Sequence, residues 1–298
     1  MRMFSDCLAC LAIVRLKDVH KLFSDESERY YVMSRVLSMI RELAIEKGLS
    51  SAPRVATAIF RWLKKVSGVE DPYAEEKRIA DENALRIYES IRKKLFELSP
   101  RERIAKALAV AAAGNALDLG VAVYQPPSVD EVLAIASENP PKGVEESVEL
   151  LMRAKRIVVV MDNAGEAVLD RVLGDTLTSL GKEVIAIVKS GAFQNDETIR
   201  DANASRLHES FNEVIESGTD AASIFLDEVS EKVVEALRQC DIVVAKGMAN
   251  YEYISDVHAE LGKPVIYVLM AKCRPIAESL GVSIRSLVAK PCTPPLNN

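Results

Sequence analysis

The second half of this 298-residue chain contains short runs of apolar, mostly β-branched residues, and this pattern constrains the fold more than any other feature. Amphipathic stretches with helical spacing separate the runs, and they are long enough for the crossover connections that parallel strands require. Strands buried on both faces have continuous apolar sequences. The pattern therefore predicts an α/β fold with a largely parallel sheet and helices on both faces. The expected strands comprise residues 156–161, 183–189, 213–217, 241–246, 265–269 and 285–290.

The first half of the chain has a different pattern. Before residue 139 the apolar residues recur at three- and four-residue spacings, as in residues 30–48 and 80–98, which indicates helices. Proline-rich turns near residues 125 and 139 mark the change of pattern. The length of the chain favours two domains. We predict a mainly helical domain over residues 1–140 and an α/β/α domain over residues 141–298.

Charge and composition narrow the expected partners and location. The formal net charge is −6 and the pI is about 5.4, so no general attraction to nucleic acid or anionic lipid is expected. Residues 104–123 are long enough to cross a membrane, but Lys106, Asn115 and Asp118 would be costly in hydrocarbon, which indicates a buried helix. The N-terminus does not resemble a signal peptide. Five cysteines are too few for a disulfide framework, so we expect a cytoplasmic protein.

One expected strand ends abruptly in polar residues. The sequence VVVMDNAGE, residues 158–166, passes from branched apolar residues to Asp162, Asn163 and Glu166. In open sheets of this kind, ligands bind beyond the carboxyl ends of the strands. The next residues, 165–182, have the pattern of a helix whose positive N-terminus faces the same place. These polar side chains therefore lie where a ligand is expected.

Two further strand ends bring polar residues to the same edge, at residues 189–196 and 246–252. An oxygen from Asn195 or Asp196, added to the carboxylate and amide of the first strand end, would suit Mg²⁺, Mn²⁺, Co²⁺ or Ni²⁺. Such an ion could bind a phosphoryl oxygen and activate water. Lys246 would add a positive charge for phosphate.

The same residues also permit structural interpretations. The DNAG segment at 162–165 could be a turn with an Asx helix cap, because Asp and Asn favour such caps. The NDET segment at 195–198 could simply begin the next helix, and Lys246 could be a solvated lysine at a strand end. The coincidence of all three at strand ends favours a ligand site.

Several ordered motifs resemble those of the damage-control phosphatases. They are MDNAGEAVLD, NDET, VIESGTD and AKGMANYE, with DPYAEEK and GNALD upstream. The resemblance runs from residue 7 to beyond residue 270, essentially the whole chain. It implies a metal-dependent phosphatase with a helical N-terminal part packed on a Rossmann-like α/β/α domain. The metal ligands would then be Asp162, Asn163 and Asp196, and Lys246 would neutralise the phosphate.

The resemblance also implies the remaining site residues. Besides Asp162, Asp196 and Lys246, the catalytic group would include Glu166. On spacing alone, Asn115 and Asp118 could instead form a buried hydrogen-bonded pair that caps a loop. The resemblance favours a place for both residues in the pocket wall. The residues implied to bind substrate are Asn115, Asp118, Ser217, Gly218, Asn250 and Glu252.

Cys7 and Cys10 form a CxxC motif, which resembles the branch of the family that is typical of archaeal members. The motif leaves three interpretations open. A structural zinc site would need two more ligands, for which no second paired motif exists. A redox role and simple packing of buried thiols are the others.

The function expected from these observations is hydrolysis of small phosphomonoesters with a divalent Mn, Co, Ni or Mg ion. The resemblance suggests sugar phosphates or damaged phosphometabolites, such as pantetheine phosphates, as substrates. Asp196 and Glu166 are the candidates for general base. Two alternatives stay open: a noncatalytic phosphometabolite-binding module, and an S-adenosylmethionine-dependent carboxyl methyltransferase. The sequence predicts no oligomeric state.

Overall fold

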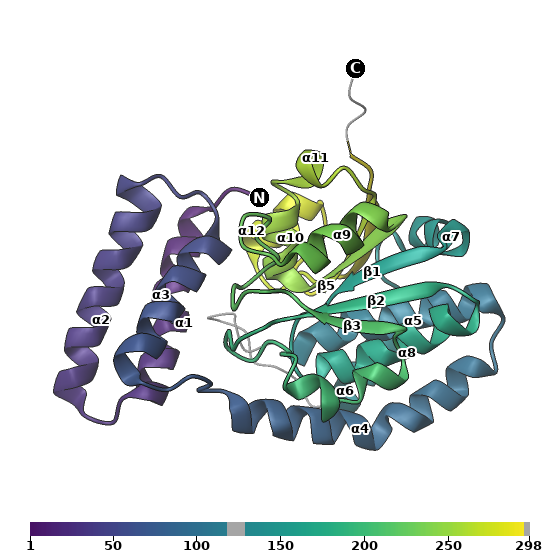
Figure 1. The fold of residues 1–298 in the computed structure, drawn as a ribbon, viewed down its shortest axis with the longest axis horizontal. Helices are drawn as coiled ribbons and strands as arrows, with labels where there is room; N and C mark the ends of the chain where they lie inside the picture. Colours follow the sequence, from purple (N-terminus) through teal and green to yellow (C-terminus); the bar gives the residue numbers. More distant parts are fainter. Residues whose placement is uncertain (118–128, 295–298) are drawn as a thin grey trace.

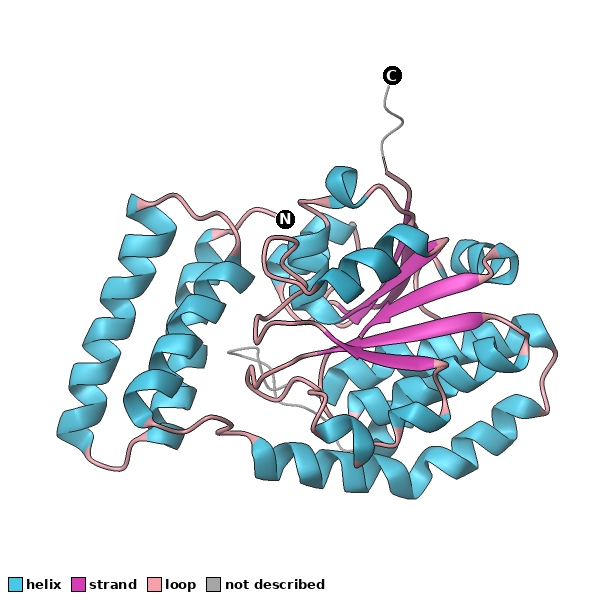
Figure 2. Ribbon diagram, in the orientation of Figure 1, coloured by secondary structure: helices cyan, strands magenta, loops and turns pink. Residues whose placement is uncertain are grey.

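The computed structural model of the protein describes residues 1–117 and 129–294. At its centre lies a six-stranded sheet with the order β3-β2-β1-β4-β5-β6, shown in magenta in Figure 2. All neighbouring strands are parallel except β5 and β6, which are antiparallel. The predicted α/β fold with a largely parallel sheet is therefore confirmed. The strands are β1 (Arg156–Val160), β2 (Glu183–Val188), β3 (Glu213–Glu216), β4 (Ile242–Lys246), β5 (Val265–Met270) and β6 (Leu287–Cys292).

Helices cover both faces of this sheet, as the continuous apolar strands require. Several begin at sequence signals for helix starts: Ser99 and Glu102 form a capping box, and Ser230 accepts a hydrogen bond from the Val233 N–H. The helices are α1 (Ser5–Leu22), α2 (Glu26–Ile40), η1 (Arg41–Glu46), α3 (Ala52–Ser67), α4 (Ala74–Phe96), α5 (Pro100–Gly114), η2 (Asn115–Leu117), α6 (Val129–Glu138), α7 (Val144–Arg153), α8 (Glu166–Ser179), η3 (Asp201–Asn203), η4 (Leu207–Glu209), α9 (Glu231–Gln239), α10 (Gly247–Ile254), α11 (His258–Leu261) and α12 (Arg274–Leu280).

Alternate residues along each strand belong to two different hydrophobic cores. In β1, Ile157 and Val159 pack in one core with α4, α5, α7 and α8. Val158 and Val160 point the other way and pack with α9, α10 and α12. This alternation produces the three-layer α/β/α arrangement. Within the described ranges, no helix combines the length and apolar character needed to cross a membrane.

Helices α1 to α3, which we call the helical unit (residues 5–67), have a hydrophobic core of their own, with Leu11, Val36 and Ile59 among its buried residues. The described residues from α4 onward, 74–117 and 129–294, include the sheet, and we call them the sheet domain. The helical unit lies beside it, at the left of Figure 1. Helices α4 and α5 pack instead with the sheet, because Tyr88 and Leu108 belong to the core that includes β1 and α8. The hydrophobic packing thus changes between α3 and α4, whereas the domain boundary at residue 140 stays a prediction.

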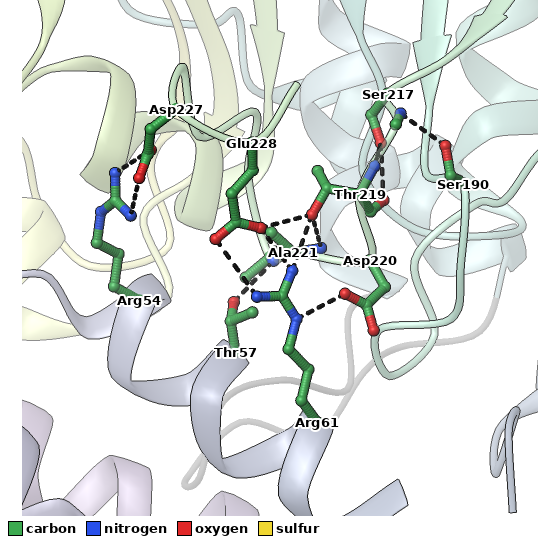
Figure 3. A network of polar contacts seen from close by, with 12 residues as sticks. Arg54, Thr57, Arg61, Ser190, Ser217, Thr219, Asp220, Ala221, Asp227 and Glu228 are labelled. Atoms are coloured by element: carbon green, nitrogen blue, oxygen red, sulfur yellow. Dashed lines mark hydrogen bonds and ion pairs between the residues drawn. The ribbon is translucent and has the colours of Figure 1, made fainter. Parts of the chain in front are cut away.

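A group of charged contacts, which we call the Arg61 clamp, joins the helical unit to the loop after β3 (Figure 3). Arg61 of α3 donates to Asp220 Oδ1 at 2.6 Å, to Glu228 Oε2 at 2.6 Å and to Thr219 Oγ1 at 2.9 Å. Arg54 forms a separate ion pair with Asp227. These contacts hold α1 and α3 over the carboxyl edge of the sheet.

Candidate active site

A pocket lies where the helical unit meets the carboxyl ends of the strands. The strand order reverses between β1 and β4: β2 and β3 follow on one side of β1, and β5 and β6 follow on the far side of β4. Such a switch point is where ligands bind in folds of this type. The cavity encloses about 150 Å³. Its wall includes Asp162, Asn163 and Asp196 from the loops after β1 and β2, Glu252 from α10 and Arg15 from α1. The site is therefore shared by the sheet and the helical unit.

Backbone hydrogen bonds bring the loops after β1 and β2 together. Asn163 and Asp196 are paired in an antiparallel bridge. On either side of it, the Ala164 N–H donates to the Asn195 carbonyl at 2.9 Å and the Glu197 N–H donates to the Asp162 carbonyl at 2.7 Å. Residues far apart in sequence are thus held side by side. The three residues predicted to bind metal lie together at the pocket wall.

The amide of Asn163 is oriented by two carboxylates. Its Nδ2 donates to Asp162 Oδ2 at 2.9 Å and to Glu166 Oε2 at 3.0 Å. Because both amide hydrogens point at these carboxylates, Oδ1 points the other way. This is the orientation that a ligand oxygen needs, and carboxylate partners of this kind commonly fix metal ligands.

Gly247, the first residue of α10, leaves room for the carboxylate of Asp162. Its φ is +76°, and a methyl group at this position would lie 1.7 Å from Asp162 Oδ2. The carboxylate therefore packs directly against the backbone at the start of α10, whose positive end favours a negative charge. An acid–amide–acid set of oxygen donors suits Mg²⁺ or Mn²⁺. In the described part of the chain, no three His, Cys, Asp or Glu side chains are grouped as a metal site. The set at this pocket wall contains two carboxylates and the amide of Asn163.

Lys246 lies behind the pocket rather than at its wall. Its ammonium group is fully buried and contacts Glu166 at 2.6 Å, Asp170 at 3.1 Å and the Ala111 carbonyl at 2.7 Å. Burial lowers the pKa of Lys246, but the attraction of Asp170 and Glu166 outweighs this effect and the net shift is upward. Burial raises the pKa of Asp170 to about 8. Lys246 thus stays charged among carboxyl groups, away from the pocket surface.

Asn115 and Glu166 belong to the same buried network. Asn115 donates to Asp162 Oδ2 at 3.0 Å and to Glu166 Oε2 at 3.1 Å, and its Oδ1 accepts from the Met270 N–H at 3.1 Å. Both oxygens of Glu166 therefore have partners inside the protein. Asn115 and Glu166 therefore orient the side chains of Asp162 and Asn163 but do not line the pocket themselves.

The other predicted substrate-binding residues lie in different places. Glu252 lines the pocket. Asn250 is buried and donates to the Met161 and Lys246 carbonyls at 3.1 and 2.8 Å, which joins α10 to the ends of β1 and β4. Ser217 and Gly218 directly follow β3, and neither lines the pocket. The Ser217 hydroxyl donates to the carbonyl of Thr219, a residue of the Arg61 clamp, at 2.8 Å (Figure 3). Asp118 lies outside the described residues.

Some pocket residues were not among the predicted site residues. Arg15 lines the cavity, but no motif surrounds it. Phe193 and Gln194 also line it, and they lie in the strand-end segment 189–196, directly before the NDET motif. Asp170 could have been found, because it lies one turn after Glu166 on α8, a helix that is otherwise largely apolar and buried.

Cys7, Cys10 and Cys273 also line the pocket, and none of the five cysteines, all within the described ranges, forms a disulfide. Burial raises the pKa of Cys7 and raises that of Cys273 to about 12. These two thiols are therefore protonated at neutral pH and are poor nucleophiles. The zinc, redox and packing interpretations of the CxxC motif stay open.

These features define an α/β/α protein with an acidic ligand pocket at the switch point of its sheet. A model of the damage-control phosphatase ARMT1-like domain matches residues 3–288, so the chain belongs to this family. Family membership supports a phosphatase role.

Individual relatives agree with this assignment. A damage-control phosphatase from Archaeoglobus fulgidus is 32% identical over 95% of this chain and 97% of that protein. A damage-control phosphatase from Pyrococcus horikoshii is 29% identical over 97% of each chain. An uncharacterized protein from Methanocaldococcus jannaschii is 31% identical over 94% of this chain and 92% of its own length. The solved structure of a DUF89 family protein from Pyrococcus horikoshii superposes with a TM-score of 0.82 at 26% identity, covering 97% of this chain and 99% of that one.

Proposed function

We propose that the protein is a metal-dependent phosphatase that hydrolyses phosphomonoesters of small metabolites. The observation that carries this proposal is the backbone pairing of the loops after β1 and β2. It brings Asp162, Asn163 and Asp196 to one pocket wall in a chain of the damage-control phosphatase family, which supports a shared metal site.

The charges at the pocket support the need for a divalent cation. The wall carries the carboxylates of Asp6, Asp162, Asp196 and Glu252, opposed by the guanidinium of Arg15. Lys189, which does not line the pocket, lies 3.5 Å from Asp196 Oδ2. Arg15 is itself paired with Asp18. A phosphate dianion entering this cavity would be repelled by the carboxylates. A bound Mn²⁺, Co²⁺, Ni²⁺ or Mg²⁺ reverses the local charge and supplies Lewis-acid chemistry.

The protein's own residues would divide the remaining work. Asp162 and Glu166 hold the amide of Asn163 in place, and Asn115 donates to both of these carboxyl groups. Glu166 and Asp170 enclose the buried ammonium group of Lys246. Asp196 is the better candidate for general base, because it lines the pocket and Glu166 does not. Asp196 Oδ2 lies 3.5 Å from Lys189 Nζ. Catalysis would be mainly electrostatic and positional.

The proposal also includes a class of substrate and a cellular location. The small cavity suits a compact phosphomonoester, such as a sugar phosphate or a damaged phosphometabolite. The free thiols are compatible with a reducing cytoplasm. Assignment to the CxxC branch of the family stays a prediction.

The test is hydrolysis of p-nitrophenyl phosphate by the wild-type protein and Asp162→Ala, with Mn²⁺, Co²⁺, Ni²⁺ or Mg²⁺ and with a chelator. We expect activity that requires a metal and falls about a hundredfold or more in the variant, because a ligand is lost. Activity that survives both chelator and substitution would overturn the proposal. Phosphometabolite binding without turnover would indicate a binding module, and binding of S-adenosylmethionine would indicate a methyltransferase.

A further inference from the structure

The cation expected to contact phosphate, Lys246, is fully buried between Glu166 and Asp170 and does not line the pocket. A different cation, Arg15 of α1, does line it, together with Asp162, Asn163 and Asp196. Arg15 therefore supplies a positive charge at the wall of this pocket.

The guanidinium of Arg15 is held rigidly. Its Nε lies 2.8 Å from Asp18 Oδ2, and Nη1 donates to the Ala56 carbonyl at 3.0 Å. The group also lies over the rings of Phe60 and Phe193, with its central carbon 5.5 and 5.8 Å from the ring centroids. Among the contacts between described residues, none involves Nη2. The side chain is thus oriented with one nitrogen still able to donate to a ligand.

Contacts of Asp18 connect this arrangement to the loop that carries Asp196. Asp18 Oδ1 accepts from the Tyr73 hydroxyl at 2.5 Å and from Gln194 Nε2 at 3.4 Å. Gln194 has a φ of +44°, an uncommon conformation for a residue with a side chain, and lies two positions before Asp196. A buried hydrogen bond therefore joins the helical unit to the loop that carries Asp196.

We propose that Arg15 binds the non-bridging oxygens of the substrate's phosphoryl group through Nη2. A guanidinium is always charged at neutral pH and is well suited to phosphate oxygens. This inference rests on the proposed phosphatase function. It makes the helical unit part of the active site rather than an appendage, because Arg15 belongs to α1.

The test compares Arg15→Lys and Arg15→Gln with a matched control, Arg54→Lys. Arg54 also lies on the helical unit and pairs with Asp227 of the sheet domain, but it does not line the pocket. For each protein, the experiment measures the affinity for inorganic phosphate in the presence of Mn²⁺ and the affinity for Mn²⁺ alone. It also measures kcat and KM for p-nitrophenyl phosphate. The substitutions at Arg15 should weaken phosphate binding about tenfold to a hundredfold, because a charge-assisted hydrogen bond is lost. The control should bind phosphate within about twofold of wild type, since Arg54 does not line the pocket and its ion pair is partly exposed.

The Mn²⁺ affinity distinguishes a residue that binds phosphate from one that only positions the loop carrying Asp196. It should be unchanged in Arg15→Lys, because Arg15 is not a metal ligand. An equal loss of Mn²⁺ and phosphate affinity would show that Arg15 only supports the Asp196 loop, and unchanged phosphate binding would show that Arg15 does not contact the phosphoryl group. Either result would overturn the inference about Arg15. The proposed phosphatase function would still stand as long as the wild-type protein hydrolyses p-nitrophenyl phosphate.

A second measurement does not depend on the variants folding. In a crystal of the wild-type protein with Mn²⁺ and phosphate, Arg15 Nη2 should lie about 3 Å from a phosphate oxygen. Phosphate bound in the pocket without this contact would contradict the inference. A wild-type protein that binds no phosphate and hydrolyses no ester would instead reject the phosphatase function itself.

Discussion

Gly247 has no side chain, and the carboxylate of Asp162 fills the space that a side chain at position 247 would occupy. A methyl group there would lie 1.7 Å from Asp162 Oδ2, and the φ of +76° disfavours any other residue by about 1–2 kcal/mol. We expect Gly247→Ala to displace Asp162 and to lower metal-dependent phosphatase activity about a hundredfold, since misplacing a reacting group by about 1 Å has an effect of this size. Hydrolysis of p-nitrophenyl phosphate and Mn²⁺ affinity measure this loss.

Gly181→Ala is the matched control for Gly247→Ala. Gly181 has a similar φ of +74°, but nothing lies within 4 Å of a methyl group added there. This variant should lose about 1 kcal/mol of stability from backbone strain and keep its activity. If both variants were equally active, the contact between position 247 and Asp162 would have no functional role.

At the scale of single elements, the start of α8 depends on a side chain from another helix. The Gly165 N–H donates to Asp81 Oδ1 of α4 at 2.6 Å. Burial raises the pKa of Asp81 to about 7, although this hydrogen bond acts in the opposite direction. The folded protein therefore favours the protonated carboxyl group. The stability gained from that form is complete below the unfolded pKa of about 4 and is lost as the pH rises through about 7.

Asp81→Asn keeps an oxygen that can accept from Gly165 and removes the ionisation. We expect the free energy of unfolding of the wild-type protein to fall between pH 5 and pH 8, and that of Asp81→Asn to fall less. Urea unfolding at several pH values measures both slopes. Equal slopes would show that Asp81 does not ionise in this range.

Asp241→Asn provides a control of opposite sign. The Asp241 carboxylate accepts from the Arg156 and Lys155 N–H groups at 2.9 and 2.7 Å, and these hydrogen bonds lower its pKa. Its stabilising contribution is present above the unfolded pKa and is lost as the pH falls. Asp241→Asn should therefore destabilise the protein more at neutral pH than in acid.

At the scale of the whole molecule, the active site depends on how the helical unit sits on the sheet domain. The Arg61 clamp joins the two across partly exposed ion pairs. We expect Arg61→Gln to weaken this junction by about 1 kcal/mol, which increases transient opening about fivefold. Hydrogen exchange should be faster in α1 and α3, with little change in the sheet.

Arg35→Gln is the corresponding control, because the ion pair of Arg35 with Glu42 lies within the helical unit. It should leave exchange at the junction unchanged. Faster exchange throughout the sheet in Arg61→Gln would show that the two parts unfold together and that the clamp does not act locally.

The sequence alone was sufficient for the sheet and for part of the site. Each strand is a short local run of branched apolar residues, so its position depends on neighbours in the sequence. The location of Asp162 and Asn163 followed from the end of one such run, and Asp196 followed from the resemblance to the family. The structure places all three at one pocket wall.

Only the tertiary structure decided which side chains face the pocket. The sequence puts Lys246 at a strand end but does not show that Glu166 and Asp170, on the neighbouring α8, enclose its ammonium group. Nor does it show that Arg15 meets the Asp196 loop, since that contact requires α1 to pack across the edge of the sheet. Strand positions depend on local apolar patterns, whereas the partners of a buried charge depend on elements brought together from distant parts of the chain, and only the folded molecule specifies those.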